Sequence, residues 1–281
     1  MKIGVITDSG SNLSLEYFES IPNLKLAPLQ INIDEVYFRD VVEKSADEVY
    51  EELKTKHIST SLPKIEDYLE AVEYFKAEGY TDILTITISS GLSGTYNAFR
   101  NANLEVEGIN MHLHDTKTLG MAEGYIVKEA LKQIKKGTAI QEIMEILDDL
   151  RFNKSVSFFT VETLKYLRRG GRIGFVEGTI GDILHVKPII SVNDDGLYYT
   201  ISKGFGMKRT YITMKKKLME FAGDDEIELT IHYGIDIEQA KELERKVEND
   251  LNVKRIDLVA ITPVLGIHTG PNIVAVCARK V

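Results

Sequence analysis

The order of apolar and polar positions divides the chain into short β-rich runs and amphipathic helical stretches. Residues 3–6 and 82–88 form apolar runs of strand length, whereas the apolar positions of 65–75 recur at helical spacing. Up to about Phe152 the predicted order is strand, helix, hairpin, two helices, strand, helix, strand and two helices. Beyond Phe152 the pattern of strands and helices starts again.

In this second series the strands and helices continue to the end of the chain. We expect strands at 155–161, 188–192, 197–200, 227–233, 256–261 and 273–278, and helices at 162–169, 207–221 and 237–249. Alternation of strands with helices is typical of α/β proteins with parallel sheets. We therefore predict two α/β domains with mostly parallel sheets, residues 1–153 and 154–281.

Local signals mark several turns and helix ends. Asp34-Glu35 is expected to turn a hairpin. Ser45–Glu48 and Thr138–Gln141 have the form of capping boxes, in which two side chains bind free N–H groups at a helix start. Gly137 is expected to end the long helix before it.

The stretch Asp82–Arg100 combines an apolar strand, a turn of small residues and a helix start. Its turn, Ser89–Thr95, holds three serines, a threonine and two glycines. The first N–H groups of a helix lack intrahelical partners, and the helix dipole adds partial positive charge there. We interpret this turn as a binding site for a carboxylate or phosphate. An ordinary strand-to-helix turn with a capping serine is the alternative.

Two catalytic motifs that use a similar turn are not matched. A phosphate-binding P-loop needs a lysine before its Ser/Thr, and Gly94-Thr95 has none. A nucleophile elbow needs G-x-S-x-G, but Gly91–Thr95 ends in threonine. The turn therefore supports neither NTP hydrolysis nor esterase chemistry.

A second polar turn follows the first strand. In a parallel sheet the ends of the strands line the ligand crevice. Asp8, Ser9 and Ser11 are therefore candidate site residues, with helix capping as the alternative.

Composition narrows the class of protein. The net charge of −9 argues against nucleic acid as a partner, and no apolar run approaches the roughly 18 residues that span a bilayer. The first residues have no signal-peptide pattern. Cys277 is the single cysteine, which excludes an intramolecular disulfide and a multi-cysteine metal site. We expect a reduced, cytoplasmic protein.

The histidines do not form an evident metal site. His112 and His114 would share one face of a strand, but no second group of ligands accompanies them, so we prefer a strand end to a metal site. His268 lies near glycines in an expected loop, Pro263–Pro271. It either is exposed there or donates a hydrogen bond to an acidic ligand.

Three arginines surround a glycine pair in this acidic chain. Arg168, Arg169 and Arg172 flank Gly170-Gly171. They either offset the dipole at a helix end or attract a phosphate or an acidic partner.

Six short motifs occur in one order along the chain, and together they resemble the DegV family. They are Thr7-Asp8-Ser9, Thr60-Ser61-x-Pro63, Ser89–Thr95, Leu167-x-x-Gly170–Gly174, Lys187-Pro188-Ile189 and His268–Pro271. The better understood members are the fatty-acid-binding subunits of bacterial fatty acid kinase. The resemblance implies a two-domain α/β protein that encloses one fatty acid. Its carboxylate would lie in the cleft between the domains, and its acyl chain in an apolar tunnel.

Carried over by position, the resemblance implies a set of ligand-binding residues. They are Thr60, Ser61, Ser93, Gly94, Thr95, His268 and Thr269. Which of Thr60 and Ser61 contacts the carboxylate stays open. Arg172 would lie near the exposed end of the ligand, with a role toward a partner or a transferred phosphoryl group.

The resemblance also implies a partner. In kinase-linked members the bound carboxyl is presented to a separate kinase catalytic subunit, which makes an acyl phosphate. We expect such a kinase, no nucleic acid and at most transient membrane contact. Phe205 stands where those members tend to carry an arginine-containing run, which makes kinase docking less secure than lipid binding.

We therefore predict a lipid-binding protein without catalytic residues, cofactor or metal, which holds a long-chain fatty acid for acyl phosphate formation. An enzyme acting on a small carboxylate or phosphorylated metabolite in the same cleft is the alternative. The sequence offers such an enzyme no nucleophile–base pair, metal cluster or P-loop lysine.

Overall fold

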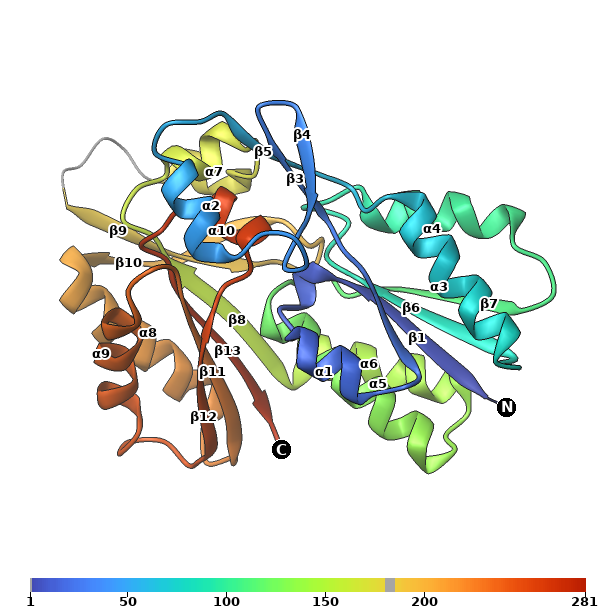
Figure 1. The fold of residues 1–281 in the computed structure, drawn as a ribbon. Coiled ribbons are helices and arrows are strands. Elements are labelled where there is room, and N and C mark those ends of the chain that lie inside the picture. Colours follow the sequence, from blue (N-terminus) through green and yellow to red (C-terminus); the bar gives the residue numbers. More distant parts are fainter. Residues whose placement is uncertain (1, 180–184) are drawn as a thin grey trace.

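The computed structural model describes residues 2–179 and 185–281, and its first sheet is fully parallel (Figure 1). The strand order is β2-β1-β6-β7, with Val5 of β1 opposite Leu84 of β6. The strands are β1 (Ile3–Asp8), β2 (Leu24–Ala27), β6 (Asp82–Thr87) and β7 (Asn110–Asp115). Every residue of β1 and β6 is buried, as expected of central strands with both faces covered.

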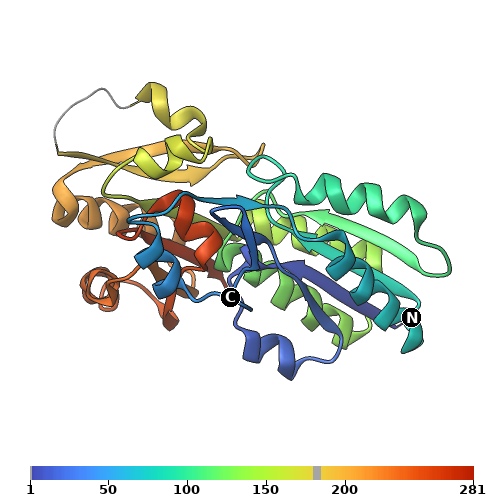
Figure 2. The same ribbon diagram turned by 45° about the horizontal axis from the view of Figure 1, so that its top comes forward.

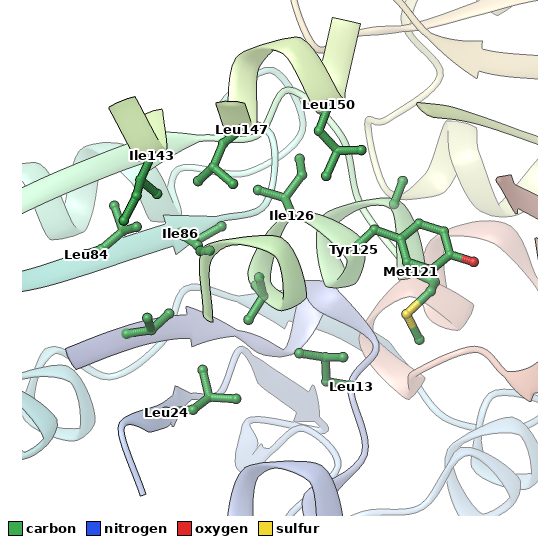
Figure 3. Close-up of a cluster of buried hydrophobic side chains, with 14 of the residues drawn as sticks. Leu13, Leu24, Leu84, Ile86, Met121, Tyr125, Ile126, Ile143, Leu147 and Leu150 are labelled. Carbon is green, nitrogen blue, oxygen red and sulfur yellow. The ribbon is translucent and has the colours of Figure 1, made fainter. Parts of the chain in front are cut away.

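Helices cover both faces of this sheet. Helices α3 (Ile65–Ala77) and α4 (Thr95–Ala102) pack on one face, where Tyr68 stacks on Phe99 with ring centroids 4.1 Å apart. Helices α5 (Met121–Lys136) and α6 (Ile140–Asn153) pack on the other. Figure 3 shows this second core, in which Ile126, Ile143 and Leu147 lie over Leu84 and Ile86 of β6. Short helix α1 (Leu15–Ser20) follows β1.

The second sheet has six strands in the order β10-β9-β8-β13-β11-β12. They are β8 (Ser155–Thr160), β9 (Val186–Val192), β10 (Tyr198–Phe205), β11 (Ile227–Tyr233), β12 (Val253–Ala260) and β13 (Val274–Lys280). Only the pair β11/β12 is parallel; the other neighbours in this sheet are antiparallel. The predicted α/β class is confirmed, but mostly parallel pairing describes the first sheet and not the second.

The outer helices of this sheet are α8 (Gly206–Ala222) and α9 (Ile237–Val247), seen at the left of Figure 1. Their apolar faces pack on β8, β9, β11 and β13. The opposite face of the sheet meets the first half of the chain, since Cys277 of β13 joins the core of α5.

A third, antiparallel sheet of three short strands, order β4-β3-β5, lies over the junction of the two larger sheets (Figure 2). Its strands are β3 (Gln30–Ile33), β4 (Val36–Arg39) and β5 (Ile58–Ser61). Together with α2 (Ala46–Glu52) it packs on Ile267 of helix α10 (Pro263–Thr269). The division into domains at residue 153 stays a prediction; these contacts join residues from both sides of it.

Most local signals agree with the structure. Asp34 and Glu35 adopt φ of 49° and 70° at the hairpin turn, and Ser45 and Glu48 form the predicted capping box. The second predicted capping box is wrong. Ala139 is the N-cap residue of α6, and the hydroxyl of Thr138 contacts the side chain of Gln133 instead.

Candidate functional site

A cavity of about 220 Å³ lies where the first sheet, the second sheet and the three-stranded sheet meet. It brings together five of the predicted site residues, from four distant segments. They are Thr60, Ser61, Ser93, Arg172 and His268. The rest of the wall is mainly apolar and includes Leu29, Ile88, Val264 and Leu265. The cavity therefore has one polar side and one apolar side.

Ser93 is the serine of the Ser89–Thr95 turn that lines this cavity. The hydroxyl of Ser89 donates to Gly196 O, and Ser90 Oγ accepts from Lys117 Nζ, so both hold the turn against neighbouring loops. Ser93 Oγ lies 2.8 Å from Thr95 Oγ1 and accepts the Thr95 N–H. Ser93 thus both lines the cavity and accepts an N–H at the start of α4.

Gly94 and Thr95 do not line the cavity themselves. Gly94 is the N-cap residue of α4 and is exposed, while Thr95 is buried behind Ser93. Their contribution to a ligand would act through Ser93.

Thr60 and His268 form the second polar pair. Thr60 Oγ1 lies 2.7 Å from His268 Nε2. Burial and the nearby Arg172 and Arg169 guanidiniums lower the pKa of His268 to about 4, so the imidazole is neutral near neutral pH. Ser61, the next residue, is exposed at the rim.

Both partners of this pair lie in regular structure, although a loop was expected at His268. Thr60 belongs to β5 and pairs with Ile31, and His268 belongs to α10. Pro263 is compatible with the first turn of a helix, and Gly266 allows α10 to pack against Tyr50, whose hydroxyl would lie 2.1 Å from an added Cβ. Gly266, one of the glycines that suggested a loop, is a packing requirement of this helix.

Gly170 and Arg172 form the outer edge of the site. A Cβ on Gly170 would lie 2.0 Å from His268 Nδ1, so only glycine allows this loop to contact the imidazole. The Arg172 guanidinium donates to Gly170 O and to Leu92 O, at 2.6 and 3.2 Å. Arg172 therefore joins the Gly170 loop to the turn that carries Ser93.

The candidates of the first turn do not line the cavity. Asp8 accepts the N–H groups of Gly10 and Ile88, and Ser11 donates to Asp8 O. Ser9 Oγ accepts the N–H of Leu29. Of the two readings of this turn, the structure favours support of the backbone over ligand contact.

A narrower cavity of about 30 Å³ adjoins the first. Leu119, Tyr198 and Leu265 line both cavities. The inner wall is apolar apart from a few groups, and it includes Gly120, His232 and Cys277. His232 is occupied, because Nε2 accepts the Met121 N–H and Nδ1 lies 3.2 Å from Val259 O.

Thr269 lies on this inner cavity and not beside the polar pairs. Its hydroxyl donates to Leu265 O within α10. The structure therefore does not bring Thr269 together with Thr60, Ser93 and His268.

The apolar wall residues were missed by sequence reasoning. Leu29, Ile88, Leu119, Tyr198 and Leu265 come from five distant segments, and each resembles an ordinary core residue in its own segment. No local pattern distinguishes a residue facing a cavity from one facing a core.

The described part of the chain contains no group of three or more His, Cys, Asp or Glu side chains suited to a metal ion. His112 pairs with Asp82 at 3.0 Å, and the buried His114 faces Asp148 instead. Within residues 2–179 and 185–281, no helix combines the length and apolarity needed to span a bilayer.

Comparisons with known proteins agree with this architecture. The family model described as an uncharacterised protein of the DegV family matches residues 2–281. A DegV domain-containing protein of Clostridium perfringens is 37% identical over 280 residues, covering 99% of both chains. One of Clostridium acetobutylicum is 36% identical over 279 residues, again with 99% coverage of both.

Solved structures of DegV family proteins are also similar to this chain. A DegV family protein from Thermus thermophilus, described by its fatty acid binding, superposes with a TM-score of 0.92 at 26% identity over 100% of both chains. A stearic acid-binding protein from Eubacterium ventriosum has a TM-score of 0.86 at 29% identity, covering 99% of this chain and 98% of that one. These descriptions name the binding of a lipid and not a catalysed reaction. The family model and the curated relatives match this chain over almost its entire length. The chain therefore belongs to the DegV family.

Proposed function

We propose that the protein binds a long-chain fatty acid, with the carboxylate in the outer cavity and the acyl chain directed into the inner one. The observation that carries this proposal is that Leu119, Tyr198 and Leu265 line both cavities, so that the polar outer cavity and the apolar inner cavity are neighbours. A polar end and an apolar interior match the two ends of a fatty acid. The fatty-acid-binding relatives from Thermus thermophilus and Eubacterium ventriosum support the same ligand class.

Hydroxyl groups would hold the carboxylate. His268 Nδ1 packs against Gly170 and has no hydrogen-bond partner among the described residues. A proton on Nδ1 would therefore be a buried donor without an acceptor, which favours the tautomer protonated on Nε2. Nε2–H then donates to Thr60 Oγ1, and the Thr60 hydroxyl proton is free to bind a carboxylate.

Ser93 would act in the same way. Its oxygen accepts the N–H of Thr95 and lies beside the Thr95 hydroxyl; when that hydroxyl donates to Ser93 Oγ, the Ser93 proton is available to the ligand. Two donors, each polarised by a donor behind it, suit a carboxylate because hydrogen bonds to a charged acceptor are stronger than neutral ones.

The acyl chain would supply most of the binding free energy. An acyl chain of about 16 carbons, at ~0.8 kcal/mol for each buried CH₂, contributes roughly 10 kcal/mol before the cost of ordering. Tight binding then needs no covalent bond to the protein.

We further propose that the bound carboxyl is presented to a separate kinase for acyl phosphate formation. Arg172 is a half-buried cation at the outer edge of the cavity, where an incoming phosphoryl group would approach. Phe205 ends β10 with 54% of its surface exposed, so this chain would offer the kinase an aromatic contact there in place of an arginine.

Denaturing extraction of the purified protein, followed by mass spectrometry, tests the ligand. A long-chain fatty acid is expected at near-stoichiometric amount. Its absence, together with no uptake of added palmitate or oleate after delipidation, would reject the proposal.

Ser93→Ala tests the site. Loss of one hydrogen bond to a charged group costs about 1.5–3 kcal/mol, or roughly ten- to a hundredfold in affinity. Ser90→Ala is the matched control, because Ser90 lies in the same turn but binds Lys117 and does not line the cavity. Equal affinities for the two variants, or a covalent acyl adduct on Ser93, would contradict the assignment.

A further inference from the structure

Helix α10 brings three residues into the outer cavity: Val264, Leu265 and His268. It has seven residues, and its N-cap residue Thr262 makes no side-chain capping hydrogen bond. A helix of two turns is not stable by itself, so its position depends on the contacts around it.

Two side chains from the first 40 residues bind the start of this helix. Asp40 Oδ1 accepts the N–H of Val264 at 3.1 Å, and Asn12 Oδ1 accepts the N–H of Thr262 at 2.8 Å. Asn12 also donates to Ala260 O, at the end of the preceding strand. Both acceptors are more than 200 residues away in sequence, and they replace the missing local cap.

Asp40 is itself hydrogen-bonded to a residue of the cavity wall. It is fully buried, and its own N–H donates to Leu29 O. The hydroxyl of Ser9 lies close to the Asp40 carboxyl, and Ser9 Oγ accepts the N–H of Leu29. Leu29 lines the same cavity as His268. Asp40 thus connects two walls of the cavity through their backbones.

We propose that Asp40 is a positioning residue for His268, acting through α10 on the carboxylate site. Val264 and His268 are four residues apart, so they lie one above the other on the same face of the helix. Fixing the N–H of Val264 fixes how far the imidazole reaches toward Thr60. The inference rests on the proposed function, since its measure is fatty acid affinity.

A double-mutant cycle on delipidated protein tests this role, with palmitate as the probe. Asp40→Ala removes the acceptor and should weaken palmitate binding about five- to tenfold, the size expected of a lost helix cap. In the His268→Ala background the same change should cost less than about twofold, because the residue that it positions is gone. Asp40→Asn keeps an oxygen acceptor of the same shape and should restore affinity to within about twofold of wild type.

Asp236→Ala is the matched control. Asp236 caps α9 by accepting the N–H of Glu238, and it lines neither cavity. It should lower the unfolding temperature without changing palmitate affinity. The same result for Asp40→Ala, or an equal loss of affinity with and without His268, would overturn the inference.

Two further outcomes are separable. If Asp40→Ala does not fold, Asn12→Gly breaks the neighbouring contact to Thr262 while permitting the φ of 54° at this position, and the cycle with His268→Ala is run on it. If the effects of Asn12→Gly and His268→Ala on palmitate affinity are fully additive, the buried contacts have no role in placing His268. If wild-type protein binds no palmitate, the proposed function fails and not the positioning.

Discussion

Replacing Thr60 by valine removes one oxygen from the centre of the proposed carboxylate site. Valine has nearly the same shape and favours strands, so β5 and its pairing with Ile31 should persist. The change deletes the hydroxyl that lies 2.7 Å from His268 Nε2. The Thr60 hydroxyl has two roles in the proposal, as a donor to the ligand and as the hydrogen-bond partner of His268, and the substitution removes both.

The magnitude follows from these two losses. A hydrogen bond to a charged carboxylate contributes about 1.5–3 kcal/mol, so affinity should fall roughly ten- to a hundredfold. An unpaired buried imidazole nitrogen should also lower the free energy of unfolding of the unliganded protein, by about 1–3 kcal/mol. Both effects come from one substitution, and separate measurements detect them.

Palmitate titration and thermal unfolding of delipidated protein are the assays, with Ser61→Ala as the comparison. Side chains of adjacent strand residues point to opposite faces, and Ser61 is exposed at the rim. Ser61→Ala should therefore weaken binding less than about threefold. A larger loss for Ser61→Ala than for Thr60→Val would refute the reasoning and give the carboxylate contact to Ser61.

Three other outcomes are expected. Arg172→Ala should keep most of the fatty acid affinity while slowing acyl phosphate formation by the matching kinase; a parallel fall of both would make Arg172 a ligand-binding residue. Burial raises the pKa of Asp40 to about 7, so the folded protein retains a proton that the unfolded chain loses near 4, and stability falls as pH rises between these values. Asp40→Asn lacks this penalty and should raise the unfolding temperature more at about pH 8 than at about pH 5; a gain independent of pH would contradict this. Burial also raises the pKa of the Cys277 thiol to about 12, so a thiol reagent should label it only after unfolding; rapid labelling of native protein would contradict its placement.

Local features of the fold were predictable because their causes lie within a few residues. The hairpin at Asp34-Glu35, the capping box at Ser45 and the helix end at Gly137 each depend on near neighbours. Strand order in the second sheet was not predictable in this way. The last strand, β13, inserts between β8 and β11, and nothing in its own sequence specifies those partners or their antiparallel direction.

The polar residues of the candidate site could be predicted from the sequence. Which polar residues line the cavity and which bind the backbone could not. Thr60, Ser93, Arg172 and His268 stand in short motifs that resemble a family, and the structure brings them to one cavity. The turn after β1 carries the same residue types, yet its Asp8 and Ser9 bind the backbone of the wall. Ser, Asp and Thr serve both purposes, and only the direction of the side chain separates them.

The choice of hydroxyls over a buried cation also bears on the proposed hand-over to a kinase. A buried guanidinium paired with the carboxylate would face a neutral carbonyl oxygen once the carboxyl became an acyl phosphate, because the negative charge would then lie on the phosphoryl oxygens. The donors Ser93 and Thr60 carry no charge, and the His268 behind Thr60 is neutral near neutral pH. They lose little when the carboxylate oxygen changes its charge. Arg172 stands at the outer edge, where the negative charge would move during transfer. Neutral hydroxyl donors within the cavity and a cation at its outer edge would thus let the same site bind both the fatty acid and its acyl phosphate.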